Sequence, residues 1–408
     1  MKNYILLSAF LLSTTTIFGQ QNQVESDSTK TQTLEEVLVQ SVRVKPNAPI
    51  THSNLTKAQL QSRNLGQDLP ILLNYLPSVV TTSDAGAGIG YTGIRVRGVS
   101  PLSTNVTING IPFTDAESLG AFWVNMPDFT SSVESLQLQR GVGTSTNGSG
   151  AFGASVNILT DASSYIPTAE VSNSFGSYNT RKHSVKFSTG KINDVFELSG
   201  RLSTINSDGY VDRAFSDLKS YFLQGTYNNN GTLIKALVFG GHEKTYQSWE
   251  GLTKQQLEDD RRQNPYTYEN EIDNYKQDHY QLHWNQKLNQ NWSTNLGLNY
   301  TYGRGYYEQY REDDAVSTYG GIVEATGVDF YGTAVTDLIR RRWLDNDFYV
   351  INATANYKES DLNFIVGGSY SNYDGDHFGE VIWARQFASE TSIRDQYYFG
   401  NGKKTDFS

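Results

Sequence analysis

The sequence predicts a mostly β chain, in which a small α+β domain precedes the long antiparallel strands of a transmembrane β-barrel. Three observations support this fold class. Residues 92–160 divide into short strand-like pieces bounded by glycine. From Thr168 onward, segments of alternating apolar and polar residues are joined by polar links. Short links mostly alternate with long ones, as in outer-membrane barrels. Beyond the N-terminus there is no run of about 20 apolar residues, so no spanning helix is expected.

Composition narrows the function classes. The 408 residues include 33 Lys and Arg against 43 Asp and Glu, and the net charge of −10 argues against a nucleic-acid surface. The sequence has neither H-E-x-x-H nor G-x-S-x-G, so we expect no enzyme, no cofactor and no metal site. His279 and His283 would share one strand face, but polar lumen residues are the favoured interpretation of that pair.

The N-terminus predicts export. Residues 1–19 combine a lysine, an apolar run and a small polar stretch, as in a secretory signal peptide, which leaves Gln20 as the first mature residue. Residues 20–45 are largely polar and predict a disordered linker. Within it, residues 33–39 are β-prone and suited to adding a strand to a partner's sheet edge. Their alternative interpretation is the first strand of the next domain.

Residues 92–160 contain four strand-like pieces: Gly93–Gly98, Asn105–Pro112, Val133–Gly141 and Gly153–Thr160. Each alternates apolar and polar residues, which indicates half-buried strands of a small mixed sheet. Asn109–Gly110 predicts a tight turn, because both residues tolerate positive φ. Two G-x-G-x-x-G matches, at 88–93 and 148–153, precede strand-like segments instead of helices, so we interpret them as turns and not as phosphate-binding loops.

The order of these pieces resembles the plug domain of TonB-dependent outer-membrane receptors. The matching motifs are Arg-x-Arg-Gly at 95–98, Asn-Gly-x-Pro at 109–112, Val-Glu-x-x-x-x-x-Arg-Gly at 133–141, Gly-x-Gly-Ala-x-Gly at 148–153 and Asn-Ile-x-Thr at 157–160. The resemblance implies a plug at 46–161 inside a barrel that starts at 162–408 and has 22 strands in the full-length family. It also implies an outer-membrane location and a periplasmic partner, TonB, which binds a TonB box made of Thr33, Leu34, Glu35, Glu36, Val37, Leu38 and Val39.

The barrel strands show a period of two. Phe196, Leu198 and Leu202 share one face, with polar residues between them. Trp292 and Tyr302 bound a strand of about ten residues, which when tilted spans the apolar band of about 25 Å. We expect nine complete strands and a tenth that starts near residue 396, hence the N-terminal part of a longer receptor. Long loops are expected at 246–275, 308–343 and 376–394, among others.

One helix is expected, at residues 67–75. Asp68 can cap it, Pro70 is tolerated in its first turn, and Pro77 stops it. The domain boundary is expected near Asp161, where the composition shifts to Ser, Thr, Asn and aromatic residues.

Alternation points Arg95, Arg97 and Arg140 away from the apolar side of the plug sheet. In a plug they would contact acidic groups on the barrel wall, whereas in a free globule they would be a solvated face. The ligand site is expected on two loops, 83–92 and 115–126, whose aromatic residues include Tyr91, Phe122 and Trp123. These rings could stack on a flat ligand. The alternative is that one or both of the adjacent rings pack against the barrel wall.

The expected function is energy-coupled uptake of a scarce ligand, with a ferric siderophore or another iron complex favoured. The stretch between Gln20 and Leu34 has no room for the extra domain that precedes the plug in related oligosaccharide receptors. Iron would enter only as part of the transported ligand, which is a small molecule. The alternatives are haem, cobalamin or another ligand, and a passive or adhesive barrel.

A proline at Val37 or Leu38 should abolish uptake, because it removes a backbone donor needed for strand addition. Binding of ligand from the outside should persist. Uptake and binding of a radiolabelled iron complex by cells carrying each variant check this. Uptake equal to that of the unmodified protein would mean that residues 33–39 are not a TonB box.

Overall fold

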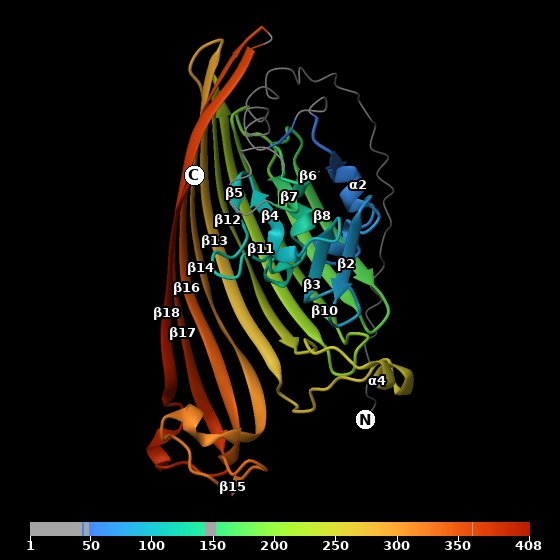
Figure 1. Cartoon of the computed structure of the whole chain (residues 1–408). Helices are drawn as coiled ribbons and strands as arrows, with labels where there is room; N and C mark the ends of the chain where they lie inside the picture. Colours follow the sequence, from blue (N-terminus) through green and yellow to red (C-terminus); the bar gives the residue numbers. More distant parts are fainter. Residues whose placement is uncertain (1–42, 45–48, 143–151, 361) are drawn as a thin grey trace, which may run out of the picture.

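The fold is that of a computed structural model, which describes residues 43–44, 49–142, 152–360 and 362–408. The expected signal peptide, most of the linker and residues 33–39 lie outside the described residues. Figure 1 shows a tall curved wall of strands with a compact domain on its concave side. Among the described residues, no helix is long and apolar enough to cross a membrane.

The compact domain is built on a five-stranded sheet. In spatial order its strands are β1 (His52–Thr56), β6 (Val133–Arg140), β7 (Ala154–Thr160), β4 (Thr104–Ile108) and β5 (Ile111–Pro112). β4 and β7 run parallel and the other neighbours antiparallel, which confirms a mixed sheet. The first expected piece lies outside this sheet, because β3 (Thr92–Val96) pairs only with β2 (Val79–Ser83).

The predicted turn at Asn109–Gly110 is confirmed. Ile108 pairs with Ile111, and the two residues between them have φ values of 52° and 83°. Two positive φ values give the tight hairpin turn whose twist matches that of the strands. The Asn109 amide also ties the turn to β7, since its Oδ1 accepts from the backbone nitrogen of Thr160 at 3.1 Å.

The helices depart from the prediction. α3 (Leu69–Leu72) has Pro70 in its first turn as expected, but it is shorter than 67–75. Asp68 is at the N-cap position as expected, but its side chain forms no capping hydrogen bond with the helix; the carboxylate is buried and accepts a hydrogen bond from Thr92 Oγ1 at 2.9 Å. Burial raises the pKa of Asp68 to about 8. A second helix in this domain, α2 (Lys57–Gln61), starts with a capping box and was not predicted.

Short helical turns complete the element list. They are α4 (Lys254–Asp259), η1 (Pro101–Ser103), η2 (Trp123–Asn125), η3 (Phe129–Ser132), η5 (Val316–Tyr319) and η6 (Glu390–Ser392).

The wall is one sheet in which each strand is antiparallel to the next. Its path is β8 (Thr168–Phe175), β9 (Arg181–Ser188), β10 (Phe196–Ser207), β11 (Ser216–Asn229), β12 (Thr232–Tyr246), β13 (Ile272–Lys287), β14 (Trp292–Ala315), β16 (Ala334–Glu359), β17 (Leu362–Ala384) and β18 (Gln396–Phe407). Off this path, β15 (Gly327–Val328) pairs with β16. The last strand begins at Gln396, as predicted.

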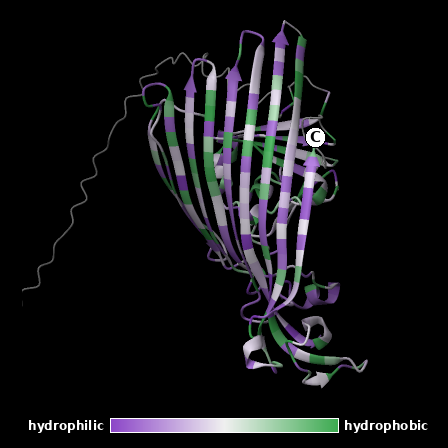
Figure 2. Ribbon diagram, turned by 90° about the vertical axis from the view of Figure 1, so that its left-hand side faces the viewer, coloured by the Kyte–Doolittle hydropathy of each residue, from purple (hydrophilic) through white to green (hydrophobic). Residues whose placement is uncertain are grey.

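Burial in the wall is inverted relative to a water-soluble protein. Register aligns Leu282, Leu298 and Ile351 across three neighbouring strands, and their exposures are 42%, 36% and 47%. Residues next to them along each strand, such as Gln281 and Asn299, point to the opposite face and are buried on the side of the compact domain. Figure 2 shows hydrophobic and hydrophilic residues alternating along the strands. Apolar side chains outward and polar ones inward are the arrangement of a membrane barrel.

The loop boundaries at one end of the wall are corrected. Strands β14, β16 and β17 have 24, 26 and 23 residues, so much of 308–343 and part of 376–394 is strand. At about 3.3 Å per residue, 24 residues reach about 80 Å, far more than the apolar band of about 25 Å. The outer parts carry many charged residues and pack partly on a small core of their own around Tyr319 and Leu338, so they lack the regular apolar alternation by which the pattern reveals a strand.

Changing Leu298 to Lys should destabilise the wall by about 2–4 kcal/mol if the residue lies near the bilayer midplane, because its charge would face hydrocarbon. The midpoint of urea unfolding in lipid vesicles measures this. Changing Gln255, which is exposed in α4, to Lys is the matched control and should leave the midpoint unchanged. Equal midpoints for both variants would contradict a lipid-facing position for Leu298.

Candidate functional site

A buried ion cluster fixes the compact domain to the wall. Asp128, which lies between η2 and η3, forms salt bridges with Lys182 Nζ of β9 at 2.5 Å and with Arg201 Nη1 of β10 at 3.0 Å. Hydroxyls complete the shell: Ser203 Oγ donates to Asp128 Oδ2 at 2.7 Å and Ser131 Oγ to Oδ1 at 2.6 Å. All three ionic side chains are almost fully buried. Burial alone raises the pKa of Asp128, but the charges of Arg201 and Lys182 outweigh it and lower the pKa to about 2.

Apolar packing surrounds this cluster. Phe129, the next residue, packs against Phe239 of β12 with ring centroids 5.2 Å apart, and against Phe222 of β11 at 6.2 Å. Phe239 in turn stacks on His279 at 4.6 Å. Trp123 and Met126 belong to the same core. Asp128 and Phe129 therefore place a charge and an aromatic ring next to each other against the wall.

A second carboxylate pins the junction between the two domains. Asp161 forms salt bridges with Lys57 of α2 at 2.6 Å and with Lys186 of β9 at 2.5 Å. Its backbone oxygen accepts from Gln224 at 2.9 Å and from Lys235 at 3.1 Å. Asp161 is the residue at which the domain boundary is expected, and it contacts both sides of that boundary.

A cavity of about 260 Å³ lies between the compact domain and the wall. Its lining includes Tyr91, Phe122 and Asp115 from the domain and Glu243 and Asp273 from β12 and β13. The Tyr91 hydroxyl donates to Asp273, and its ring packs edge-on against Trp249 at 5.4 Å. The wall residues are in the parts of the strands nearer the long connections, so the cavity lies on that side of the domain.

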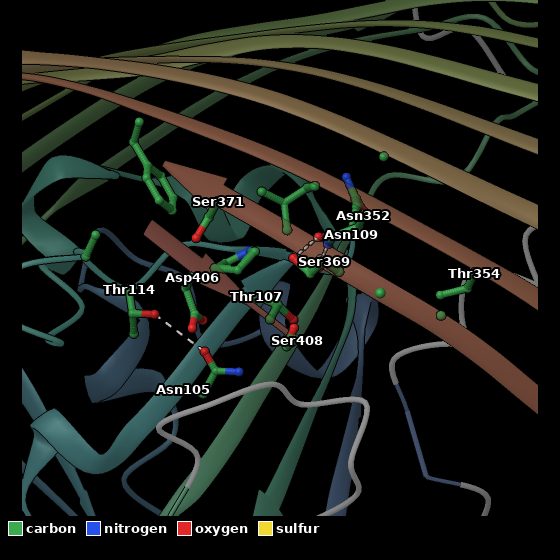
Figure 3. A pocket seen from close by; sticks show the side chains of 18 of the residues that line it. Asn105, Thr107, Asn109, Thr114, Asn352, Thr354, Ser369, Ser371, Asp406 and Ser408 are labelled. Atoms are coloured by element: carbon green, nitrogen blue, oxygen red, sulfur yellow. Dashed lines mark hydrogen bonds between the residues drawn. The ribbon is translucent and has the colours of Figure 1, made fainter. Parts of the chain in front are cut away.

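A larger cavity of about 520 Å³ lies between β4–β5 and the strands β16–β18. Figure 3 shows that most of its labelled side chains carry hydroxyl, amide or carboxyl groups. Asn352 Nδ2 donates to the backbone oxygen of Gly110 at 2.7 Å, and Ser369 Oγ donates to Asn352 Oδ1 at 2.5 Å. The turn of the compact domain is thereby held against the wall.

Comparison with known proteins identifies the compact domain. A family model, TonB-dependent Receptor Plug Domain, matches residues 45–155. These residues include most of the compact domain, which is therefore similar to the plug domain of TonB-dependent receptors. The probable TonB-dependent siderophore receptor PirA of Acinetobacter baumannii is 25% identical over 224 residues, which are 52% of this chain and 28% of PirA.

Solved structures match both the plug and the wall. The ferric-catecholate import receptor Fiu of E. coli K12 gives a TM-score of 0.65 at 13% identity and covers 88% of this chain. The copper transporter OprC gives 0.66 at 12% over 90%, and the siderophore receptor PiuA of Acinetobacter baumannii 0.60 at 14% over 88%. The chain spans about half the length of each of these structures, namely 53%. They establish the fold, a plug within a wall of barrel strands.

The plug arginines do not behave alike. Arg140 is buried, and its guanidinium donates to Pro77 O at 3.0 Å and Ser53 Oγ at 2.9 Å, both within the plug. Strand alternation gives a face and not the partner on that face, and both of these bonds lie within the plug, so the contact of Arg140 with the barrel wall stays a prediction. Arg95 and Arg97 are exposed and form no ion pair with the described wall, so their contact stays a prediction.

Of the three predicted ligand residues, the structure brings Tyr91 and Phe122 to the 260 Å³ cavity. Trp123 is only 4% exposed and packs beside Phe113 in the core, with ring centroids 6.3 Å apart. Of the two adjacent rings, Phe122 is therefore exposed and Trp123 is packed, although both line a second cavity of about 230 Å³ together with Tyr91. Their role in ligand binding stays a prediction. η2 starts at Trp123, and this helical turn directs the ring inward.

Sequence analysis missed the groups that meet the plug. Lys182 and Arg201 lie on the polar faces of their strands, but nothing in the pattern names Asp128 as their partner.

His283 is fully buried and faces the plug, and the described residues contain no group of three or more candidate metal ligands.

Acidification should loosen the plug. The unfolded pKa of an aspartate is about 3.9, and that of Asp128 is lowered to about 2. Its contribution is therefore fully present above about pH 4 and is lost as the pH falls towards 2, an effect of about 2–3 kcal/mol. Urea unfolding followed by tryptophan fluorescence at a series of pH values measures the loss.

The Asp128→Asn variant is the control. It should lose this acid dependence and be less stable by about 3–5 kcal/mol at neutral pH, since two cations stay buried without a counter-charge. Asp217→Asn removes an exposed carboxylate and should do neither. An unchanged acid profile in Asp128→Asn would mean that the cluster does not hold the plug.

Proposed function

We propose that this protein is an outer-membrane receptor that imports an iron complex, with a ferric siderophore as the cargo and TonB as the energy-transducing partner. The observation that carries the proposal is the plug domain, seated by a buried ion cluster on the polar face of the wall. A domain held in this way closes the path along the wall, so import requires an energy input that releases or remodels it. The export signal predicted from the sequence at residues 1–19 agrees with this location.

The choice of iron complexes draws on the relatives and on the cavity. PirA is named a probable siderophore receptor and Fiu a ferric-catecholate import receptor. The 260 Å³ cavity has aromatic lining residues on the plug, among them Tyr91 and Phe122, which suit an organic ligand with flat groups. OprC, a copper transporter, shares the fold, so the fold alone does not select the cargo. Haem and cobalamin are the next ligands to test.

A passive or adhesive barrel is the second candidate. The segment 33–39 distinguishes the two, because a barrel without energy coupling needs no periplasmic strand for a partner.

Growth of a deletion strain on a panel of iron sources tests the proposal. The strain should fail to grow on one or a few iron–siderophore complexes, and the gene supplied on a plasmid should restore growth. A strain that lacks TonB should show the same defect with the gene present. Normal growth of the deletion strain on every iron source, or import that persists without TonB, would overturn the proposal.

A further inference from the structure

The 260 Å³ cavity presents hydrogen-bond acceptors that have no donor. Glu243 is 2% exposed, and its Oε2 has no hydrogen-bond partner among the described residues. Asn125, on the plug side, is 8% exposed, and its Oδ1 also lacks a partner there. Both residues line the cavity. A buried acceptor without a donor is costly, so two acceptors from different domains at one cavity point to a ligand that donates.

Two of the carboxylates that line this cavity lie next to each other on the wall. Thr245 pairs with Asp273 and Glu243 with Tyr275, so Glu243 and Asp273 are diagonal neighbours on one face of β12 and β13. Diagonal side chains at this spacing lie within reach of a common ligand. Asp115 of the plug also lines the cavity. Within the described chain, neither Glu243 nor Asp273 forms a salt bridge.

The cation in the lining is already engaged. Arg342 lies over the rings of Tyr307 and Tyr398, at 5.6 Å and 5.5 Å from their centroids. It therefore forms the aromatic side of the cavity and does not neutralise the carboxylates. Two buried carboxylates close together are unfavourable as anions, and either protonation or a bound cationic group relieves this cost.

We propose that this cavity binds a protonated primary amine of the transported ligand, with Glu243, Asp273 and Asn125 as its acceptors. An ammonium group has three donors and no acceptor, which matches the three groups. Aromatic rings such as those of Tyr91 and Phe122 favour an organic cation over a bare metal ion. The inference rests on the proposed function and narrows its cargo. A ferric tricatecholate with three negative charges would meet like charges here, so the favoured complex carries a pendant amine.

Two synthetic complexes test the inference. Both are iron(III) trihydroxamates of the same size; one bears a free primary amine and the other carries that amine acetylated. Binding to the protein in outer-membrane vesicles is measured with radioactive iron. The amine complex should bind about tenfold tighter or more, because acetylation removes a charge-assisted hydrogen bond.

The Glu243→Gln variant should reduce the preference to about twofold or less, because the amide keeps the size of the side chain and removes its charge. Glu258→Gln, at an exposed position of α4, is the matched control and should keep the full preference. Heat-modifiable migration on a gel confirms that each variant is folded. The comparison of the two complexes on the unmodified protein stands without any variant.

Equal affinities of the two complexes for the unmodified protein would overturn the inference, as would a full preference in folded Glu243→Gln. Import of the acetylated complex at the same rate would overturn it and leave the proposed function intact. Binding of neither complex would overturn it as well. The proposed function fails separately, if the deletion strain grows on every iron source.

Discussion

The plug depends on one rule of protein electrostatics: a buried charge must have a partner. Asp128 forms salt bridges with two cations of the wall, and among the described residues neither cation has a salt bridge to another carboxylate. Each cation comes from a different strand, so the contact fixes both the position and the rotation of the plug segment against β9 and β10. Phe129 then fills the adjacent apolar space. Charge sets the orientation, and ring packing adds burial of apolar surface.

The wall obeys a complementary constraint. Between its two edge strands, β8 and β18, its backbone groups pair within the strand ladder, so side chains decide which face meets lipid and which meets the plug. Polar side chains on the inner face are buried against the plug, so they need hydrogen-bond partners there. Asn352, for example, donates to the backbone oxygen of Gly110. The plug is therefore a structural component of the wall's inner face.

Periodicity predicted much of this architecture. The strand pieces, the Asn109–Gly110 turn and the strand that begins at Gln396 all follow from local alternation and glycine placement. Contacts between distant segments could not be predicted in this way. Asp128 is a lone acid in a loop, Arg140 is on a strand whose polar side faces its own domain, and Trp123 depends on a single helical turn. Each outcome is set by a neighbour more than 40 residues away, or by a backbone turn without a sequence signature.

The great length of β14, β16 and β17 divides each of these strands between two solvents. Their inner parts border the apolar belt, whereas the outer parts end in a small core around Tyr319 and Leu338 and in ion pairs such as Asp337–Arg385. The first region is held by lipid and the second by contacts in water, so one continuous strand has two independent sources of cohesion. Detergent exchange acts on the former and ionic strength on the latter. The two ends of one hydrogen-bonded ladder therefore depend on different solvents for their stability.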